Sequence, residues 1–321
     1  MIDVGVIGCG SLPSAELIRV LINHPDVELK WVSGGCPDGM RLDAVVPGIV
    51  GECPLVVTDD APLDDVDVVF VSGSRKDAAC RLAGMSIPED LRVIDMSGCH
   101  NNDFGDDSQW DYGLGEMQRR VLVHEARLVT VPGNAAAASL LALMPLARNL
   151  LINSPVELQV QMGETAMPLI DGRRATIDGM DAAEWASDQC REVTTALKAC
   201  QTSFSQPVTM TVNPIDERRA LVVEACLNCA VDADMVRELY EQYYDDHNFV
   251  FIVDRPIVTA DVENTNKCLL RIHKDDASGR LTVQAVMDAL LKGSAGNAVH
   301  AMNLMFGLHE RVGLALKATG C

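Results

Sequence analysis

The chain has 321 residues and is 48% hydrophobic, which excludes a disordered protein and allows two domains of ordinary size. Its formal net charge of -20 disfavours nucleic acid and anionic membrane surfaces, so we expect neither as a partner. The eleven cysteines lack the spacing of a secreted disulfide framework, and no leader pattern precedes the first apolar run, which predicts a cytoplasmic protein.

The first part of the chain alternates short apolar runs with amphipathic segments. The opening 32 residues read as strand, helix and strand, the beginning of a βαβ unit. Later runs are continuous and rich in β-branched residues, as in strands buried on both faces. The pattern predicts a doubly wound parallel sheet of the Rossmann type, with strands at 2–7, 27–32, 66–72, 91–96 and 127–131 and a first helix at 14–23.

From residue 156 the strands become longer, which favours an α+β domain on a mostly antiparallel sheet. We expect strands at 156–162, 208–212, 219–230 and 267–273, with helices near 181–200 and 233–244. A glycine-rich turn at Gly293 and Gly296 then leads into a final helix. The predicted domains are residues 1–152 with 296–321, and residues 153–295.

The long apolar strand at 219–230 would leave an exposed apolar sheet face in a monomer, so we expect a homo-oligomer. The same strand contains Cys226 and Cys229, the only CxxC pair of the chain. Without a second pair, packing explains these cysteines better than metal or redox chemistry. We expect no metal site.

The segment from Val131 to Ala137 turns from a strand through Pro132 and Gly133 directly into an alanine-rich helix. Backbone N–H groups and the positive end of the helix dipole gather at such a terminus, so a cysteine there would be a reactive thiolate. The residue at this point is Asn134. Its carboxamide can cap the helix or donate to an anion, but it cannot form a thioester.

Several segments together carry a resemblance to a known family. They are Glu16 to Glu28, Val93 to Ser97, Tyr112 to Glu116, Asn264 to Leu269 and Leu291 to Gly307. Nearly the whole chain resembles the N-acetyl-gamma-glutamyl-phosphate reductases of arginine biosynthesis, especially the form found in Bacteroidetes. The resemblance implies a Rossmann domain, an α+β domain for substrate and oligomerisation, and reduction of an acyl phosphate to a semialdehyde by NADPH.

The expected catalytic positions differ from the family pattern. The family's Pro-Gly-Cys reads Pro-Gly-Asn here, so Asn134 stands where the nucleophile is expected. The second His of the family's His-x-His-x-Pro-Glu-Ile corresponds to Gln189, which cannot relay a proton near neutral pH. The family's Ser-x-Asp-Tyr/Phe-Arg reads Ser-Gly-Cys-His-Asn from Ser97, so Asn101 replaces the arginine.

The dinucleotide loop is altered as well. Ser11 stands at the second glycine of the family's pattern, where it either obstructs a pyrophosphate or adds a hydroxyl contact. Neither an acidic residue nor an arginine adjoins Ser33, so the sequence leaves the choice between NAD and NADP open, and NADP is expected by resemblance alone. The candidate cofactor positions are Gly8, Gly10, Ser11, Leu12, Ser33, Ser72, Gly293 and Gly296.

A further difference lies at residues 161–167, where bulk and the carboxylate of Glu164 replace a glycine-rich turn. Cys99, beside His100, and Cys190 are the thiols that could substitute for a nucleophile, although neighbouring side chains usually diverge.

Three functions remain open. The first is an inactive homologue that acts by binding, for example to an active paralogous reductase or to a small ligand. The second is a nicotinamide-dependent oxidoreductase of different chemistry, and the third is an acyl-phosphate reductase with a substitute cysteine.

Overall fold

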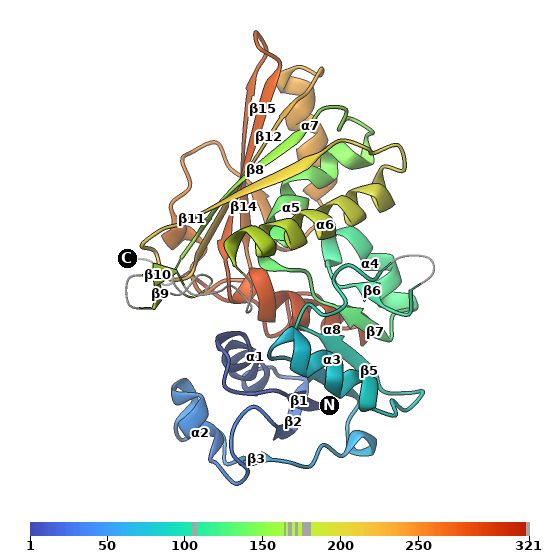
Figure 1. Cartoon of the computed structure of the whole chain (residues 1–321), viewed down its shortest axis with the longest axis vertical. Coiled ribbons are helices and arrows are strands. Elements are labelled where there is room, and N and C mark those ends of the chain that lie inside the picture. Colours follow the sequence, from blue (N-terminus) through green and yellow to red (C-terminus); the bar gives the residue numbers. More distant parts are fainter. Residues whose placement is uncertain (105–107, 164, 166–168, 171–172, 175–180, 319–321) are drawn as a thin grey trace. The chain divides into compact units, whose positions relative to one another are not determined.

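The computed structural model describes residues 1–104, 108–163, 165, 169–170, 173–174 and 181–318. The chain forms two compact units (Figure 1). The first contains residues 1–132 and 294–315, and the second contains residues 133–293 and 316–321.

The first unit is built on a seven-stranded sheet in the order β3-β2-β1-β4-β5-β7-β6, and its strand pairs are parallel. Its strands are β1 (Ile2–Ile7), β2 (Val27–Ser33), β3 (Val57–Thr58), β4 (Val68–Val71), β5 (Arg92–Asp95), β6 (Asp111–Tyr112) and β7 (Leu128–Thr130). Its helices are α1 (Leu12–Ile22), α2 (Leu42–Val45), α3 (Arg75–Gly84), α4 (Gly115–His124) and α8 (Gly296–Met305). The predicted Rossmann-type sheet is confirmed.

The buried position of the central strands explains their composition. All four residues of β4 are buried, as a continuous β-branched and aromatic run requires when helices cover both faces of a parallel sheet. The C-terminal helix α8 contacts α1 and α4 within this unit. His24 Nε2 lies 3.0 Å from Asn303 Oδ1 of α8. His300 Nε2 of α8 lies 3.0 Å from Glu310 Oε2, and the other oxygen of Glu310 lies 2.6 Å from Arg119 Nη2 of α4.

The second unit has a six-stranded mixed sheet in the order β11-β8-β12-β15-β14-β13, beside a small hairpin of β9 and β10. Three of the five pairings in the larger sheet are antiparallel, as predicted, and the two outermost are parallel. The strands are β8 (Val156–Met162), β9 (Leu169–Ile170), β10 (Arg173–Arg174), β11 (Val208–Pro214), β12 (Ala220–Asn228), β13 (Val250–Ile252), β14 (Cys268–Asp275) and β15 (Arg280–Asp288), and the helices are α5 (Asn134–Arg148), α6 (Ala182–Cys200) and α7 (Ala233–Tyr244).

Helix α5 is the core of the second unit, since its residues from 135 to 147 are all buried. Pro145 lies inside it and has no N–H to donate to the carbonyl of Leu141, four residues earlier. The hydroxyl of Tyr244 from α7 donates to that carbonyl at 2.5 Å, and Tyr240 donates to the carbonyl of Ala142. Helix α5 tolerates Pro145 because the hydroxyl of Tyr244 donates to the buried carbonyl that the proline leaves without a donor.

The sheet face turned away from these helices is mainly polar, which differs from the apolar exposed face expected from the sequence. Along β8, Glu157, Gln159 and Gln161 are exposed on that face. The apolar residue Val222 of β12 is itself buried in a cluster with Val262, Leu269 and Val286. The chain thus covers most of the apolar part of this face with its own loop.

Candidate functional site

Asn134 is the first residue of α5, directly after the N-cap residue Gly133. The Oδ1 atom of Asn134 accepts a hydrogen bond from the backbone N–H of Ala135 at 2.7 Å. The side chain thus bends over the first turn of its own helix, where backbone donors have no partner within the helix. Asn134 therefore accepts a hydrogen bond from a backbone N–H of its own helix, and its carboxamide offers no nucleophile.

Two residues of α6 complete this helix terminus. Gln189 Oε1 accepts from the backbone N–H of Ala136 at 3.0 Å, and Glu192 Oε1 accepts from the N–H of Gly133 at 3.0 Å. Gln189 is 1% exposed and Glu192 is fully buried. Gln189 also donates from Nε2 to Glu192 Oε2 at 3.5 Å. The sequence-predicted pair Asn134 and Gln189 is therefore brought to one helix terminus.

The packing at this terminus leaves little room. A Cβ atom added to Gly133 would collide with the amide group of Gln189, which explains why glycine occupies the N-cap position. A Cβ atom added to Gly293 would lie 3.1 Å from the Cβ of Asn134. Gly293, expected at the cofactor, thus lies beside position 134 and permits the close approach of its backbone.

The arrangement consumes the donors that make a helix N-terminus chemically useful. The N–H groups of Gly133, Ala135 and Ala136 each have an acceptor from a side chain of this chain. Such donors stabilise an anion only when they are free to point at it. Sequence reasoning did not single out Glu192, although it occupies the glutamate of the family's histidine motif and could have been found there.

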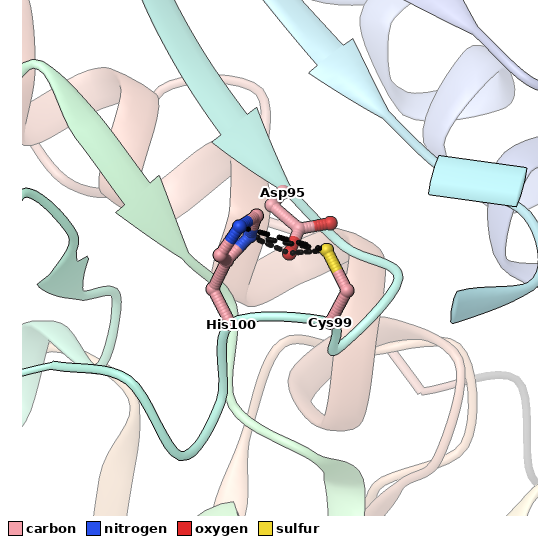
Figure 2. A group of neighbouring side chains, drawn as sticks. All are labelled: Asp95, Cys99 and His100. Atoms are coloured by element: carbon pink, nitrogen blue, oxygen red, sulfur yellow. Dashed lines mark hydrogen bonds and ion pairs between the residues drawn. The ribbon is translucent and has the colours of Figure 1, made fainter. Parts of the chain in front are cut away.

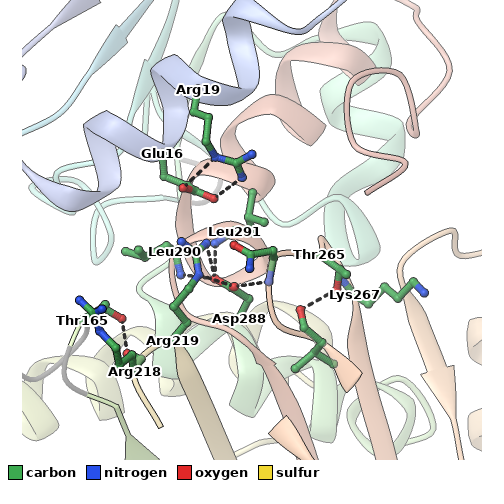
Figure 3. Close-up of polar contacts among 12 residues, drawn as sticks. Glu16, Arg19, Thr165, Arg218, Arg219, Thr265, Lys267, Asp288, Leu290 and Leu291 are labelled. Carbon is green, nitrogen blue, oxygen red and sulfur yellow. Dashed lines mark hydrogen bonds and ion pairs between the residues drawn. The ribbon is translucent and has the colours of Figure 1, made fainter. Parts of the chain in front are cut away.

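A second polar centre of this unit surrounds Asp288, which is fully buried at the end of β15 (Figure 3). Its carboxylate accepts from Arg219 Nε at 2.7 Å and Nη2 at 3.0 Å, and from the backbone N–H groups of Asn264, Leu290 and Leu291 at 2.8, 2.9 and 3.0 Å. Arg219 and Asp288 also line a cavity of about 270 Å³. These contacts fix the chain just before the turn containing Gly293.

The dinucleotide loop of the first unit keeps the tight turn expected from its glycines. Gly8 and Gly10 both have a φ of +89°, a conformation that favours glycine. A Cβ atom at Gly8 would collide with the carbonyl of Ser72, another predicted cofactor residue. The N–H of Gly8 donates to the carbonyl of Ser33 at 2.8 Å. Gly8 therefore packs against Ser33 at the end of β2 and Ser72 directly after β4, two further predicted positions.

The start of α1 is capped by serine side chains. Ser11 is its N-cap residue, and its Oγ accepts from the N–H of Ser14 at 3.2 Å, while Ser14 Oγ accepts from the N–H of Ser11 at 3.1 Å. Side-chain oxygens thus occupy donors that a phosphate would use. Leu12 follows with a side chain 53% exposed. Gly296, the last predicted position, is buried at the start of α8.

The two candidate substitute thiols are both held protonated near neutral pH. Burial, together with the nearby charge of Asp95, raises the pKa of Cys99 to about 12, and burial raises that of Cys190 to about 11. The expectation that Cys99 and His100 diverge is wrong, since Cys99 Sγ lies 3.1 Å from His100 Nδ1. Asn101 is buried, and its Oδ1 accepts from Thr130 Oγ1 at 2.6 Å.

Other sequence-based expectations have simpler outcomes. Glu164, Ala166 and Met167 of the altered turn lie outside the described residues. Cys226 and Cys229 are free and buried, as packing residues would be. Among the helices of the described residues, none is long and apolar enough to cross a membrane.

Comparison with known proteins assigns the class of fold. Residues 3–124 match the family described as semialdehyde dehydrogenase, NAD binding domain, and residues 188–289 match semialdehyde dehydrogenase, dimerisation domain. The chain is similar in structure to aspartate semialdehyde dehydrogenase II of Vibrio cholerae complexed with ASA, with a TM-score of 0.71, 15% identity and coverage of 96% of this chain and 98% of that one. It is also similar to the aspartate semialdehyde dehydrogenase of Candida albicans with NADP, with a TM-score of 0.70, 13% identity and coverage of 95% and 98%.

Sequence similarity defines the family more closely. A protein of Phocaeicola vulgatus named N-acetyl-gamma-glutamyl-phosphate reductase is 37% identical over 322 residues, which cover 99% of each chain. The chain belongs to the N-acetyl-gamma-glutamyl-phosphate reductase family.

Proposed function

We propose that this protein is a catalytically inactive member of its family that acts by binding. The observation that carries this proposal is the hydrogen bond from the Ala135 N–H to the side chain of Asn134. It gives the residue at the expected nucleophile position a capping role. A carboxamide is a very poor nucleophile toward an acyl phosphate, because its nitrogen lone pair is delocalised into the carbonyl.

The family reaction, as the resemblance implies it, begins when a thiolate attacks the acyl carbon and phosphate leaves. Hydride from NADPH then reduces the thioester, and the resulting hemithioacetal releases the semialdehyde and the thiol. Without a thiol at position 134 the first bond does not form. In a serine protease, removal of the covalent nucleophile lowered kcat about 10⁶-fold, and we expect a loss of similar size here.

Gln189 and Glu192 support the same proposal. Gln189 supplies an acceptor to the Ala136 N–H and has no group that titrates near neutral pH. Glu192 supplies an acceptor to the Gly133 N–H. An oxyanion formed during acyl transfer would need donors at such a helix terminus, and here the N–H groups of Gly133, Ala135 and Ala136 already donate to side-chain oxygen atoms.

The test is an assay for oxidation of N-acetylglutamate semialdehyde with NADP and phosphate, followed by NADPH absorbance. The relative from Phocaeicola vulgatus, assayed alongside, establishes that the substrates are competent. We expect no turnover by this protein. A rate of even about 1 s⁻¹, the low end for ordinary enzymes, would overturn the proposal.

Restoration of both expected catalytic groups sharpens this test. Asn134→Cys alone should give little activity, since the proton-transferring group is still absent. Asn134→Cys with Gln189→His should exceed the single variant by about 10²-fold or more, the usual contribution of general acid–base catalysis. Equal activity of the two variants would contradict the assigned role of position 189.

We further propose that NADP binds weakly, because the capping of α1 by Ser11 and Ser14 competes with pyrophosphate. Calorimetric titration with NADPH tests this. A dissociation constant below 1 µM would contradict it and favour a nicotinamide-dependent oxidoreductase of different chemistry.

We also propose homo-oligomers, and association with an active paralogous reductase as one form of binding, in view of the match to a dimerisation domain. Sedimentation of the purified chain should give a species larger than a monomer at micromolar concentration. A monomer would contradict this.

A further inference from the structure

Three side chains that the proposed function does not use meet at the end of β5 (Figure 2). His100 Nδ1 lies 3.1 Å from Cys99 Sγ and 3.1 Å from Asp95 Oδ2, and Cys99 Sγ lies 3.3 Å from the same oxygen. Sulfur, nitrogen and oxygen thus form a compact triangle within the first unit. Within the described residues, this is the one group of three such side chains close enough to share a metal ion.

The local backbone explains how adjacent residues converge. Asp95 ends β5, and the chain then turns at Gly98, which has a φ of +78°. This left-handed conformation favours glycine and reverses the chain so that Cys99 and His100 return toward Asp95. The N–H of Asp103 donates to the carbonyl of His100 at 2.9 Å and stabilises the turn.

Neighbouring groups orient two members of the triangle, Asp95 and His100. Asp95 is fully buried, and its Oδ1 accepts from the N–H of Ser97 at 2.8 Å and from Ser97 Oγ at 2.6 Å. These bonds occupy one carboxylate oxygen and direct the other at the triangle. The ring of His100 stacks on Trp110 with a centroid distance of 3.9 Å and an interplanar angle of 14°. Support of this kind around the ligands is typical of protein metal sites.

A catalytic triad explains this geometry poorly. In a Cys–His–Asp relay the two ring nitrogens divide the work, one facing the thiol and the other the carboxylate. Here both partners lie nearest to Nδ1, while Nε2 is 3.9 Å from the sulfur. The three donor atoms lie within 3.3 Å of one another, which is close enough for them to share a metal ion.

We propose that Asp95, Cys99 and His100 form a site for a divalent transition ion, with Zn²⁺ as the favoured occupant. With zinc bonds of about 2.3 Å to sulfur and about 2.0–2.2 Å to nitrogen and oxygen, a tetrahedral site separates its ligand atoms by about 3.4–3.6 Å. The observed 3.1, 3.1 and 3.3 Å require an expansion of a few tenths of an ångström. The His100 ring must also turn, because a sulfur only 3.9 Å from Nε2 lies to one side of the Nδ1 lone pair.

Charge and ligand type agree with this assignment. On binding, the thiol of Cys99 loses its proton to solvent as the sulfur–metal bond forms, so thiolate and carboxylate together neutralise the ion. The thiolate selects zinc or a similar ion over Mg²⁺ and Ca²⁺, which prefer oxygen ligands. Three protein ligands leave a fourth position for water or a small ligand.

Cobalt substitution tests the site without reference to any enzymatic activity. The full-length protein is reduced, treated with a chelator, desalted and titrated with Co²⁺. We expect one equivalent to bind with a thiolate-to-cobalt charge-transfer band and intense visible bands of tetrahedral type, and one equivalent of Zn²⁺ to abolish them. No charge-transfer band, or a band of octahedral type only, would overturn the proposal.

Ligand variants assign the signal to these residues. Cys99→Ser should abolish the charge-transfer band, and His100→Gln should weaken Zn²⁺ binding at least about 10-fold in competition with a chromophoric chelator, by analogy with losses seen on altering zinc-site surroundings. Cys80→Ser, at an exposed cysteine, and Cys190→Ser are the matched controls and should retain both signals. Circular dichroism of each variant verifies folding. Retention of the band in folded Cys99→Ser would overturn the proposal.

Discussion

The N-terminus of α5 and the turn after β5 are two places where the resemblance expects family residues and the chain has others. At α5 an amide caps the helix, with Oδ1 of Asn134 on the N–H of Ala135 at 2.7 Å. After β5 the expected aspartate and aromatic residue are Cys99 and His100, which converge on Asp95. At the α5 terminus, side chains accept hydrogen bonds from backbone N–H groups. In the turn after β5, side chains of types that can bind metals lie together.

The comparison shows that replacing motif residues can either occupy the useful groups of a site or bring new reactive groups together. A helix terminus is useful for catalysis through its free donors, and acceptors from Asn134, Gln189 and Glu192 occupy three of them here. The turn after β5 already contains a buried carboxylate, so a cysteine and a histidine beside it create a new set of ligands.

The largest expected effect concerns Cys190, the thiol next to Gln189. Its pKa of about 11 leaves roughly 100-fold less thiolate at pH 8 than the ordinary value of 9.0. Alkylation by iodoacetamide in the folded protein should be slower by about that factor than in urea, and should rise about tenfold per pH unit up to pH 10. Peptide mass spectrometry measures the rate, with exposed Cys80 as an internal control. If the alkylation rate reached a plateau below pH 9, Cys190 would be ionised enough to act as a nucleophile. That result would weaken the difference drawn between the α5 terminus and the turn after β5.

Gly133→Ala tests the packing at the α5 terminus. The added methyl group would collide with the Gln189 amide, which would lose its bond to the Ala136 N–H on moving away. Overpacking together with a buried unpaired donor should lower the free energy of unfolding by about 2–4 kcal/mol. Gly84→Ala, which has open space at the end of α3, is the matched control and should change stability by less than about 1 kcal/mol. Equal urea midpoints for the two variants would contradict a closely packed terminus.

Ser97→Ala tests the support of the metal-ligand triangle and has a smaller expected effect. Loss of the hydroxyl removes the 2.6 Å bond to Asp95 Oδ1, which should cost about 1.5 kcal/mol in the metal-free protein. Ser203→Ala, at an exposed serine, is the control and should be neutral. If both variants unfold at the same urea concentration, the carboxylate does not depend on Ser97 for its orientation.

Periodicity predicted the fold well because burial dictates composition. The bounds of β1, β8 and α7 match the expected ranges, and both sheets have the expected character. The strands β3, β13 and β15 were not among those expected. Other errors lie at the ends of elements, where capping residues set the bounds. Helix α1 begins two residues early because Pro13 fits a first turn and Ser11 caps it. The domain limits at 152 and 296 stay a prediction.

The candidate site was predictable only in part. Asn134 and Gln189 were found through motif positions, and the structure brings them to one helix terminus. The contribution of Glu192 and the convergence of Cys99 with His100 depend on side-chain directions. A turn with a positive φ at Gly98 sets those directions, and the sequence pattern alone does not fix that angle. The sequence-based expectation of no metal site was made without that angle and is opposed only by the proposal above.

The central claim is that no acyl-enzyme forms at the N-terminus of α5. The most direct measurement is intact-protein mass spectrometry after brief incubation with N-acetyl-gamma-glutamyl phosphate and acid quenching, with the Phocaeicola vulgatus relative as positive control. A thioester replaces one thiol hydrogen by the acyl group while phosphate leaves, so it appears as a defined mass increase. We predict this adduct on the relative and an unmodified mass for this protein. A stoichiometric adduct on this chain, mapped to any cysteine, would contradict the account.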